Sequence, residues 1–323
     1  MKKYKEIHKD NLKKNKFNFR DPFLIDEQYS SEEIMVRNTA RNFAEKELLP
    51  KIVDANRHEK YDKDIFLKFG KMGFLGSQIS GYGCAGISSV GYGLISKEIE
   101  AVDSSYRSSI SVQSSLVMQP IYDFGNENQK KRWLPKLAKG ELIGCFGLTE
   151  PDHGSDPSSM KTKVKKTKGG FIINGSKNWI SNSPIADIFL VWAKDEDNVV
   201  RGFVLERNKI TSGLSTPKIE GKFALRASPT GLILLDDVFI PYESQLEKAS
   251  GLIAPMTCLT SARFGISWGC LGAAEFCWLA TRDYALERKQ FGKPLAANQL
   301  IQKKLADMQT EISIAMQANL RVG

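Results

Sequence analysis

The chain has 323 residues, of which 41% are hydrophobic and 26% are charged. This length allows about two domains of ordinary size, and the composition excludes disordered and fibrous proteins. No stretch of about 18 uninterrupted apolar residues occurs, so the sequence predicts no transmembrane helix.

The net charge of +9 is concentrated at the N-terminus. Residues 1–20 hold seven lysines and Arg20 against Glu6 and Asp10, a balance of +6, which leaves +3 for the rest. We expect a solvated basic arm here, because blocks of like charge usually remain in solvent. A nucleic-acid binder would spread its basic residues over a folded surface, so no nucleic-acid partner is expected. The arm fits a mitochondrial presequence poorly, which favours the bacterial cytoplasm over the mitochondrial matrix of a eukaryote.

Cysteine and histidine are few and scattered. The five cysteines form no C-x-x-C pair, and the three histidines are not at ligand spacing. The sequence therefore predicts reduced thiols and no metal site.

From about residue 30 to 139 the pattern is helical. Ser30 and Glu33 form a capping box that predicts a helix start, and Pro50 is expected to end that segment. Asn126 and Gln129 predict a second start. A further helix is expected over Val90–Val102, because one helical face collects the apolar residues Leu94, Ile95, Ile99 and Val102.

From about residue 142 to 241 the periodicity is that of β-strands. Strands are expected at the runs rich in Val, Ile, Phe and Trp, which are Phe171–Asn174, Ile188–Ala193, Gly202–Leu205 and Leu232–Ile240. The pair Asn174-Gly175 predicts the tight turn of a β-hairpin.

From about residue 252 the chain is helical again. An apolar seam suited to helix–helix packing recurs at steps of four and three, at Ile301, Leu305, Met308, Ile312 and Ala315. The order of helices, strands and helices predicts an α+β protein and disfavours a doubly wound sheet. Gly81–Gly86 formally matches G-x-G-x-x-G, but no strand precedes it, so we expect a loop between helices, and a nicotinamide-binding protein stays a weak alternative.

The segment Gly144–Asp156 joins a strand-like run to a loop rich in hydroxyls, carboxylates and glycines, a composition that lets a backbone approach a ligand closely. Together with five other stretches it resembles the acyl-CoA dehydrogenase family, and within it the glutaryl-CoA dehydrogenases. The matching stretches are Tyr106–Ile121, Gly144–Met160, Asn178–Asp187, Lys222–Ser228, Ala262–Gly269 and Arg288–Met308.

The resemblance implies an N-terminal helical domain at 21–140, a middle antiparallel β domain at 141–245 and a C-terminal helical bundle, incomplete here, at 246–323. It also implies an FAD-dependent enzyme that oxidises and decarboxylates glutaryl-CoA to crotonyl-CoA and CO2, as in lysine and tryptophan degradation. Electrons would pass to an electron-transferring flavoprotein, and the full-length protein would be a homotetramer.

The same resemblance implies roles for individual residues. Arg107 would face the distal carboxylate of the substrate, since a guanidinium fork can bind both oxygens, with Glu100 supporting it. Without the resemblance, Arg107 would be expected to pair with Asp103. Further acyl-CoA contacts are implied for Ser108, Ser111, Ser155, Met256 and Arg263. FAD contacts are implied for Phe146, Gly147, Leu148, Thr149, Ser155, Trp179, Ser181, Asn182 and Ser183, and, towards a neighbouring subunit, for Arg288, Phe291 and Gln299.

The catalytic base is the main departure from the family pattern. In this branch it is a glutamate in a Glu-Gly-Thr context near the C-terminus, which we expect beyond Gly323; the position used by some relatives is Ala262 here. The chain is therefore expected to be a fragment that by itself lacks α-proton abstraction. The alternatives are a dehydrogenase of another short-chain acyl-CoA and a catalytically silent flavin- or acyl-CoA-binding protein.

Overall fold

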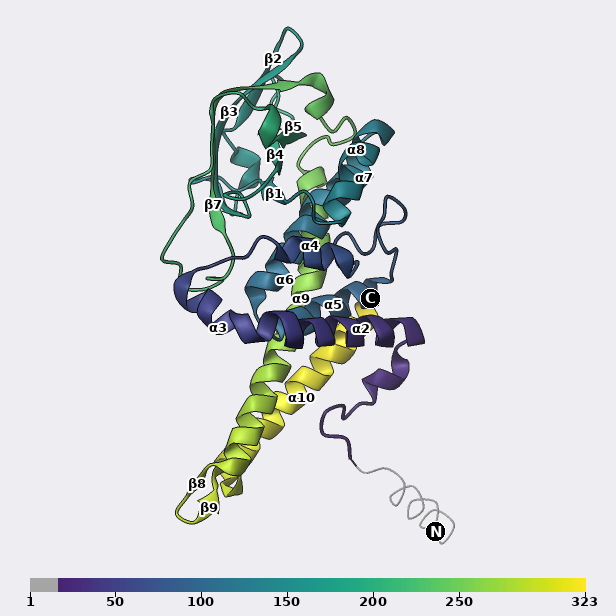
Figure 1. The fold of residues 1–323 in the computed structure, drawn as a ribbon, viewed down its shortest axis with the longest axis vertical. Helices are drawn as coiled ribbons and strands as arrows, with labels where there is room; N and C mark the ends of the chain where they lie inside the picture. Colours follow the sequence, from purple (N-terminus) through teal and green to yellow (C-terminus); the bar gives the residue numbers. More distant parts are fainter. Residues whose placement is uncertain (1–16) are drawn as a thin grey trace.

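The computed structural model describes residues 17–323, so most of the predicted basic arm lies outside the described residues. Helices, a β-sheet and two long helices follow one another along the chain, which confirms the predicted α+β order. Figure 1 shows the sheet at one end of the molecule and the long helices extending past the other end. Within residues 17–323, no helix combines the length and apolarity that a membrane span requires.

Both predicted capping boxes are present, at Ser30 with Glu33 and at Asn126 with Gln129. The expectation that Pro50 ends its helix was wrong. Pro50 lies in the first turn of α3, directly after the π-helical turn that joins α3 to α2, where the regular i→i−4 hydrogen-bond ladder is already interrupted. The helical segments of this part are η1 (Ile25–Gln28), α2 (Ser31–Phe43), η2 (Ala44–Leu48), α3 (Leu49–His58), α4 (Ile65–Lys71), α5 (Ser89–Glu100), α6 (Ser104–Ser111), η3 (Val112–Met118), α7 (Gln119–Phe124) and α8 (Glu127–Ala138).

Helix α5 is the predicted Val90–Val102 helix, and its apolar residues are buried in the core. It packs against the long C-terminal helix α9 (Ile253–Glu287) through glycines. A Cβ on Gly93 would lie 2.5 Å from the Trp268 ring, and one on Gly272 would lie 1.9 Å from the Lys97 carbonyl oxygen. The two helices therefore approach backbone to backbone. Gly81–Gly86 lies in the loop between α4 and α5, as expected.

The sheet of the middle part has the strand order β1-β4-β2-β3-β7-β6, and β5 pairs with β4. It is mixed rather than wholly antiparallel as expected, because β1 runs parallel to β4 and β2 makes one parallel bridge to β4. The strands are β1 (Gly144–Gly147), β2 (Lys163–Thr167), β3 (Gly170–Ser181), β4 (Ile188–Lys194), β5 (Val200–Glu206), β6 (Leu214–Ser215) and β7 (Thr230–Pro241), and short 3₁₀ turns lie at η4 (Pro157–Ser159), η5 (Arg207–Lys209) and η6 (Tyr242–Ser244).

The predicted hairpin turn at Asn174-Gly175 was wrong. Both residues lie inside β3, where the register with β7 shifts, and the β2–β3 turn is at Lys168 and Gly169 instead. Gly175 has a φ of 147°, and a Cβ there would lie 2.4 Å from Thr162 Oγ1. The glycine therefore permits a bulge in β3 and a close approach to Thr162, the two roles that glycine commonly has inside a strand.

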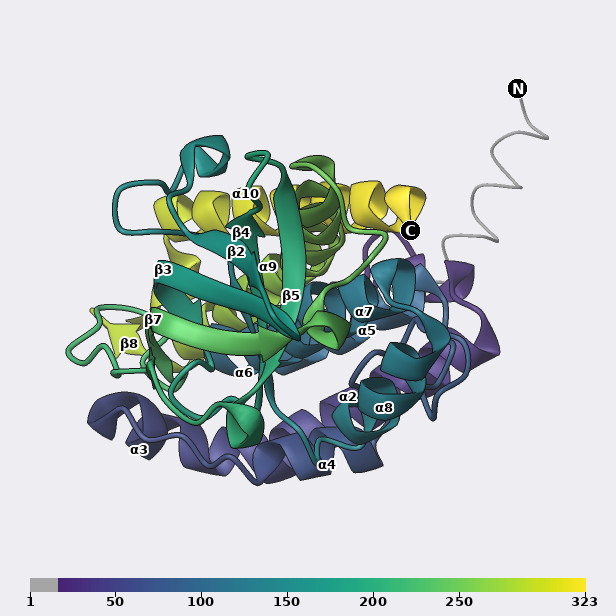
Figure 2. The ribbon, with the colours of Figure 1, turned by 90° about the horizontal axis from the view of Figure 1, so that it is seen from above.

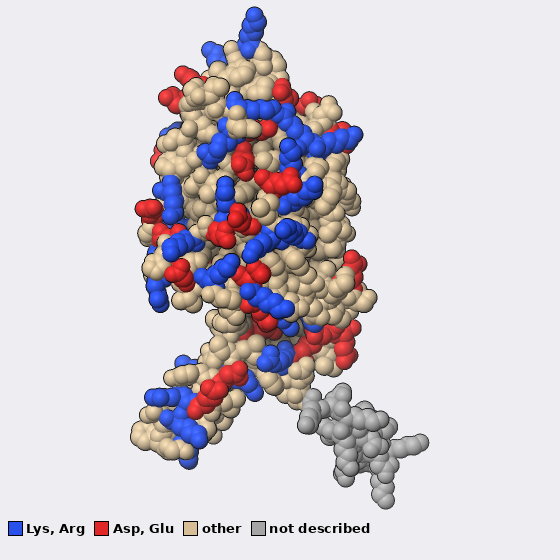
Figure 3. All heavy atoms as spheres, in the orientation of Figure 1, with Lys and Arg blue, Asp and Glu red and all other residues tan. Residues whose placement is uncertain are grey.

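The long helices α9 and α10 (Gln299–Val322) are joined by the small hairpin β8 (Lys289–Gln290) and β9 (Lys293–Pro294) and the turn η7 (Leu295–Ala297). The predicted seam of α10 is half-buried, and Trp278 Nε1 of α9 donates to the Leu305 carbonyl oxygen at 2.9 Å. Seen from above, α10 lies on the opposite side of the molecule from α3 and α4 (Figure 2). On the face in Figure 3, basic and acidic side chains are interspersed rather than gathered into one stripe.

Candidate active site

A pocket of about 380 Å³ lies where the three parts of the chain meet. Its walls come from η3, from β1 and the loop after it, from the end of β3, and from the start of α9. The lining residues are Val112, Leu116, Phe146, Leu148, Thr149, Gly154, Ser155, Pro157, Trp179, Ile180, Ser181, Met256, Leu259 and Arg263.

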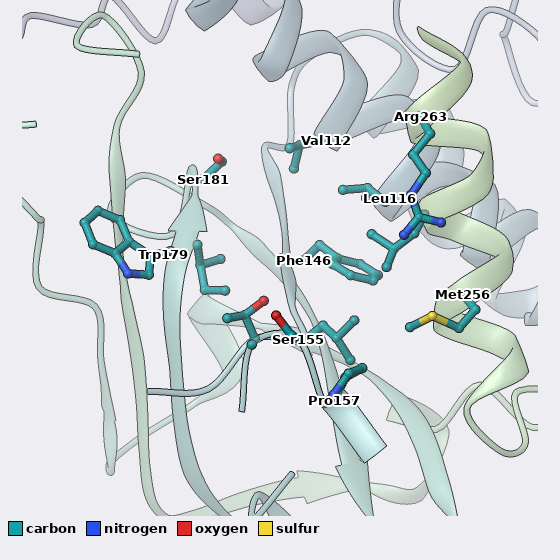
Figure 4. Close-up of a pocket in the computed structure, with 14 residues that line it drawn as sticks. Val112, Leu116, Phe146, Ser155, Pro157, Trp179, Ser181, Met256 and Arg263 are labelled. Carbon is teal, nitrogen blue, oxygen red and sulfur yellow. The ribbon is translucent and has the colours of Figure 1, made fainter. Parts of the chain in front are cut away.

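An apolar floor is provided by the end of β1. Phe146 is buried with its ring edge-on to Trp192 at a centroid distance of 6.1 Å, and Leu148 is buried beside it. Thr149 and Ser155 follow on the loop and also line the pocket, and Figure 4 shows Ser155 between Trp179 and Pro157. The Asn178 amide donates to the Thr149 carbonyl oxygen at 2.9 Å and so ties this loop to β3.

Trp179 forms the opposite wall, and its backbone is unusual. It sits where β3 slips against β7 between Lys177 and Ile180, and it has a φ of 60°. Left-handed backbone at a bulky residue is costly and persists where the surroundings enforce it, as they do at many binding sites. The indole is 60% exposed and faces the pocket across from Met256 and Arg263 on α9 (Figure 4). The fold thus holds a large flat side chain open to solvent.

The charge of the pocket lining is positive only. Arg263 is charged, and none of the other lining residues is Asp, Glu, Lys or His. Apolar surfaces, three hydroxyls and one guanidinium suit a flat heteroaromatic ring together with an anionic ligand. Among residues 17–323, no group of three or more His, Cys, Asp and Glu is placed to hold a metal ion.

Three of the residues implied for the cofactor lie behind the pocket instead of lining it. Gly147 is buried in β1, and Asn182 and Ser183 are fully buried after β3. Asn182 Nδ2 donates to the Gly144 carbonyl oxygen at 3.2 Å, and Ser183 Oγ donates to the Ile180 carbonyl oxygen at 3.1 Å. Their side chains therefore hold β1 and the end of β3 in place.

Arg107 lies on α6, just before the η3 residues that line the pocket, but it is not itself a lining residue. It is buried, and its Nε donates to Glu100 Oε2 at 2.5 Å, while Ser104 Oγ donates to Glu100 Oε1 at 2.6 Å. The expected alternative partner Asp103 instead caps α6, accepting from the Ser105 amide at 2.7 Å. Spacing along one helix favoured Asp103, whereas packing brings Glu100 of α5 to the guanidinium.

The other implied residues are separate from the pocket. Ser108 and Ser111 lie on α6 beside Arg107 and are not among its lining residues. Arg288, Phe291 and Gln299 lie around the exposed β8–β9 hairpin at the far end of α9 and α10 (Figure 1). Within one chain the structure therefore does not bring them to the pocket.

Some lining residues were missed by the sequence reasoning. Val112, Leu116, Pro157 and Ile180 are ordinary apolar residues that carry no chemical signal of their own. Val112 and Leu116 lie in a π-helical turn, and such turns frequently mark functional sites, but no sequence pattern announces one. All four lie within stretches that the family resemblance covered, but it implied no role for them.

A buried ion pair lies directly behind the pocket loop. Lys177 Nζ is 2.9 Å from Glu150 Oε1, and both side chains are almost entirely buried. Although burial opposes it, hydrogen bonds from Lys161 and Thr162 and the charge of Lys177 lower the pKa of Glu150 to about 2. Burial lowers the pKa of Lys177 to about 8, against the opposing pull of Glu150.

Lowering the pH should destabilise the folded state through protonation of Glu150. A carboxyl whose pKa is lower in the folded state stabilises that state above its unfolded pKa and loses this contribution as pH falls towards the folded pKa. We therefore expect the midpoint temperature of unfolding to decrease as the pH is lowered from about 4.5 to about 2. Thermal unfolding of the Glu150→Gln variant over the same range is the control, and an equally steep fall in that variant would contradict the assignment.

Comparisons with known proteins bear directly on this pocket. Family models for the N-terminal, middle and C-terminal domains of acyl-CoA dehydrogenases match residues 30–141, 145–238 and 249–323. The chain belongs to the acyl-CoA dehydrogenase family. An acyl-CoA dehydrogenase of Bacillus subtilis (strain 168) is 37% identical over 292 residues, covering 88% of this chain and 76% of the relative.

Solved structures of other members share the fold. A glutaryl-CoA dehydrogenase from Mycobacterium smegmatis in complex with FADH2 superposes with a TM-score of 0.92 and 41% identity, over 95% of this chain and 78% of the other. Butyryl-CoA dehydrogenase from Megasphaera elsdenii gives a TM-score of 0.86 and 32% identity, over 91% and 79%. The relatives thus include enzymes for acyl groups with and without a distal carboxylate.

Acyl-CoA dehydrogenases are FAD-dependent oxidoreductases, and the pocket residues fit a flavin. FAD bound there would supply the hydride acceptor for oxidation of the substrate. The lining residues that would hold it are Trp179 and Phe146, with flat apolar surfaces, and Thr149, Ser155 and Ser181, with hydroxyl groups that can form hydrogen bonds. The walls from η3 and α9 contribute apolar side chains, and Arg263 supplies a positive charge that suits an anionic ligand.

Proposed function

We propose that this acyl-CoA dehydrogenase is of the glutaryl-CoA type, oxidising and decarboxylating glutaryl-CoA to crotonyl-CoA and CO2. Electrons would leave the flavin for an electron-transferring flavoprotein. The observation that supports the proposal is the buried Arg107, which lies on α6, the helix that continues into the η3 wall of the pocket. A substrate with a carboxylate at its far end needs such a cation, whereas an uncharged acyl chain does not.

The surroundings of Arg107 support this role. Glu100 accepts a hydrogen bond from Nε, and among the described residues the two terminal nitrogens of the guanidinium have no hydrogen-bond partner. Those terminal nitrogens form the fork that suits two carboxylate oxygens. α6 carries Arg107 and continues into η3, so the residue that would read the substrate and the wall that would contain it are on one continuous helix.

Arg107→Ala separates the proposed substrate from its rivals. We expect the dissociation constant for glutaryl-CoA, measured by perturbation of the flavin spectrum, to rise about 10- to 100-fold, because charge-assisted hydrogen bonds are lost. Binding of butyryl-CoA to the same variant is the control and should stay within about twofold. Equal weakening for both ligands would favour a dehydrogenase of an uncharged short-chain acyl-CoA, for which the apolar Val112 and Leu116 would suffice.

We further propose that the proton-accepting carboxylate comes from outside residues 17–323. No carboxylate lines the pocket, and position 262 on α9 holds a buried alanine. The FAD-loaded 323-residue chain should therefore bind glutaryl-CoA under anaerobic conditions without bleaching of the flavin, although dithionite bleaches it. Bleaching by glutaryl-CoA would overturn this proposal, and the absence of bleaching in the longest natural form of the protein would favour a silent binding protein.

The proposed quaternary structure is a homotetramer in which the β8–β9 hairpin reaches the flavin of a neighbouring subunit. Phe291 is fully exposed at the tip of this hairpin, and the apolar residues of α9 are not confined to one face, with Phe276 and Tyr284 exposed. Exposed apolar residues on more than one face of a helix favour packing partners on more than one side. Sedimentation velocity of the FAD-loaded protein tests this, and a monomer that keeps FAD with full affinity after Arg288→Ala would contradict it.

A further inference from the structure

The loop between β1 and β2 carries several of the residues that line the pocket, yet much of it is exposed to solvent. Thr149, Gly154, Ser155 and Pro157 all come from this loop, and residues 151–159 are mostly exposed. An exposed polar loop without an anchor opens readily, because few buried contacts hold it. Something beneath the loop must therefore fix these residues for a ligand to meet them in one arrangement.

The carboxylate of Glu150 closes the loop on itself. It accepts hydrogen bonds from the Lys161 amide at 2.6 Å, the Thr162 amide at 2.9 Å and Thr162 Oγ1 at 2.6 Å. Glu150, near the start of the loop, is thereby tied to the last two residues of the loop. Glu150 is 5% exposed, so these bonds are shielded from competing water.

Lys177 of β3 anchors the closed loop from behind. Its side chain is completely buried, and Nζ donates to Glu150 Oε1 at 2.9 Å and to the Leu148 carbonyl oxygen at 3.1 Å. The Asn178 amide adds a bond to the Thr149 carbonyl oxygen. The three consecutive residues 148–150 are thus all bonded to residues 177 and 178, immediately before the bulge that exposes Trp179.

We propose that Glu150 and Lys177 are positioning residues, a buried clasp that closes the 150–162 loop and aligns it with Trp179 on both sides of the ligand. Neither side chain lines the pocket, so the pair acts through Leu148, Thr149, Ser155 and Trp179. This inference rests on the assignment of the pocket to FAD and acyl-CoA. The clasp itself is a property of the folded chain and can be tested without a ligand.

The test uses the purified 323-residue chain with Lys177→Met, Glu150→Gln and the double variant. The matched control is Asp152→Asn, which removes the exposed ion pair between Lys161 and Asp152 in the same loop. Trypsin cleavage after Lys161 reports opening of the loop, and cleavage after the exposed Lys289 in the distant β8–β9 hairpin reports a remote site. Each variant is digested well below its own thermal midpoint, and its FAD affinity is measured by quenching of flavin fluorescence.

Each single variant should speed cleavage after Lys161 and weaken FAD binding about tenfold, because one charge of the pair is left buried without its partner. The double variant should lose less FAD affinity than the two single losses combined. The cleavage rate and FAD affinity of Asp152→Asn should stay within about twofold of those of the parent chain. Cleavage and FAD binding in Lys177→Met and Glu150→Gln that match the control would overturn the proposal. Equal acceleration of cleavage after Lys161 and after Lys289 would also overturn it, because that result would mean general destabilisation.

The ligand-free cleavage and the flavin titration answer different questions. Failure of the unsubstituted chain to bind FAD would count against the assignment of the pocket, whereas unchanged cleavage after Lys161 would count against the clasp.

Discussion

Replacing Gly272 by alanine is expected to lower the free energy of unfolding by about 2–3 kcal/mol, although alanine favours helix formation. A Cβ at this position of α9 would lie 1.9 Å from the carbonyl oxygen of Lys97 and 2.7 Å from its carbonyl carbon. Both atoms belong to the backbone of α5, which cannot turn aside as a side chain can. The two helices must therefore separate, and the core between them loosens.

Gly91→Ala in α5 is the matched control for this substitution. Its Cβ would lie 3.1 Å from the end of the flexible Ile87 side chain, which can move. We expect a change within about 1 kcal/mol, including the gain in helix propensity of about that size. Urea unfolding of both variants makes the comparison, and equal stability of the two would show that α5 and α9 tolerate separation.

The second large effect is expected at the buried pair of Glu100 and Arg107. Their side chains are 4% and 11% exposed, so Glu100→Gln leaves a buried guanidinium without a counter-charge. We expect a loss of about 3 kcal/mol, because breaking a buried ion pair costs more than the pair itself contributes. A Glu100→Gln variant with the same urea midpoint of unfolding as the parent chain would contradict this expectation.

The double variant Glu100→Gln with Arg107→Met completes the cycle. Since no charge is then left buried, stability should return to within about 1 kcal/mol of the parent chain, even though the pair is gone. Binding of glutaryl-CoA should remain weak in the double variant, because the guanidinium fork is absent. Recovered stability with lost binding would separate the structural role of the pair from its proposed role in substrate choice.

Local sequence signals predicted well where the structure depends on neighbouring residues. The capping boxes at Ser30 and Asn126 involve residues three positions apart, and both formed as expected. The strands of the middle part were placed because their alternating or continuous apolar runs reflect burial in a sheet. These signals are short-range, so the rest of the fold does not alter them.

The wrong predictions came from sequence patterns that are compatible with two different local structures. Asn174-Gly175 suits a hairpin turn, but glycine equally serves a bulge next to Thr162, and only the packing of the β1–β2 loop decides between them. Pro50 can end a helix or begin one, and the π-helical turn before it decided for the second. The partner of Arg107 depended in the same way on α5, which spacing along α6 does not reveal.

The candidate site was predictable only through long matching stretches. Thr149, Ser155, Trp179 and Arg263 lie in such stretches and do line the pocket. The buried clasp at Glu150 was not foreseen, because a lysine in a strand signals an exposed edge and gives no hint of complete burial.

The pocket takes its walls from residues between Val112 and Arg263, and the last wall comes from α9. During synthesis the site is therefore incomplete until α9 has emerged and docked against η3 and β1. Contacts so distant in sequence form late in folding, because the loop between them must close first. The site binds its ligand only when α9 is docked, so bound flavin stabilises the docked arrangement of the three parts. At a free flavin concentration a hundred times the dissociation constant, this adds about 2.7 kcal/mol to the stability of the docked state. Loss of cofactor is accordingly expected as the first sign that α9 has come loose, before any helix or strand unfolds.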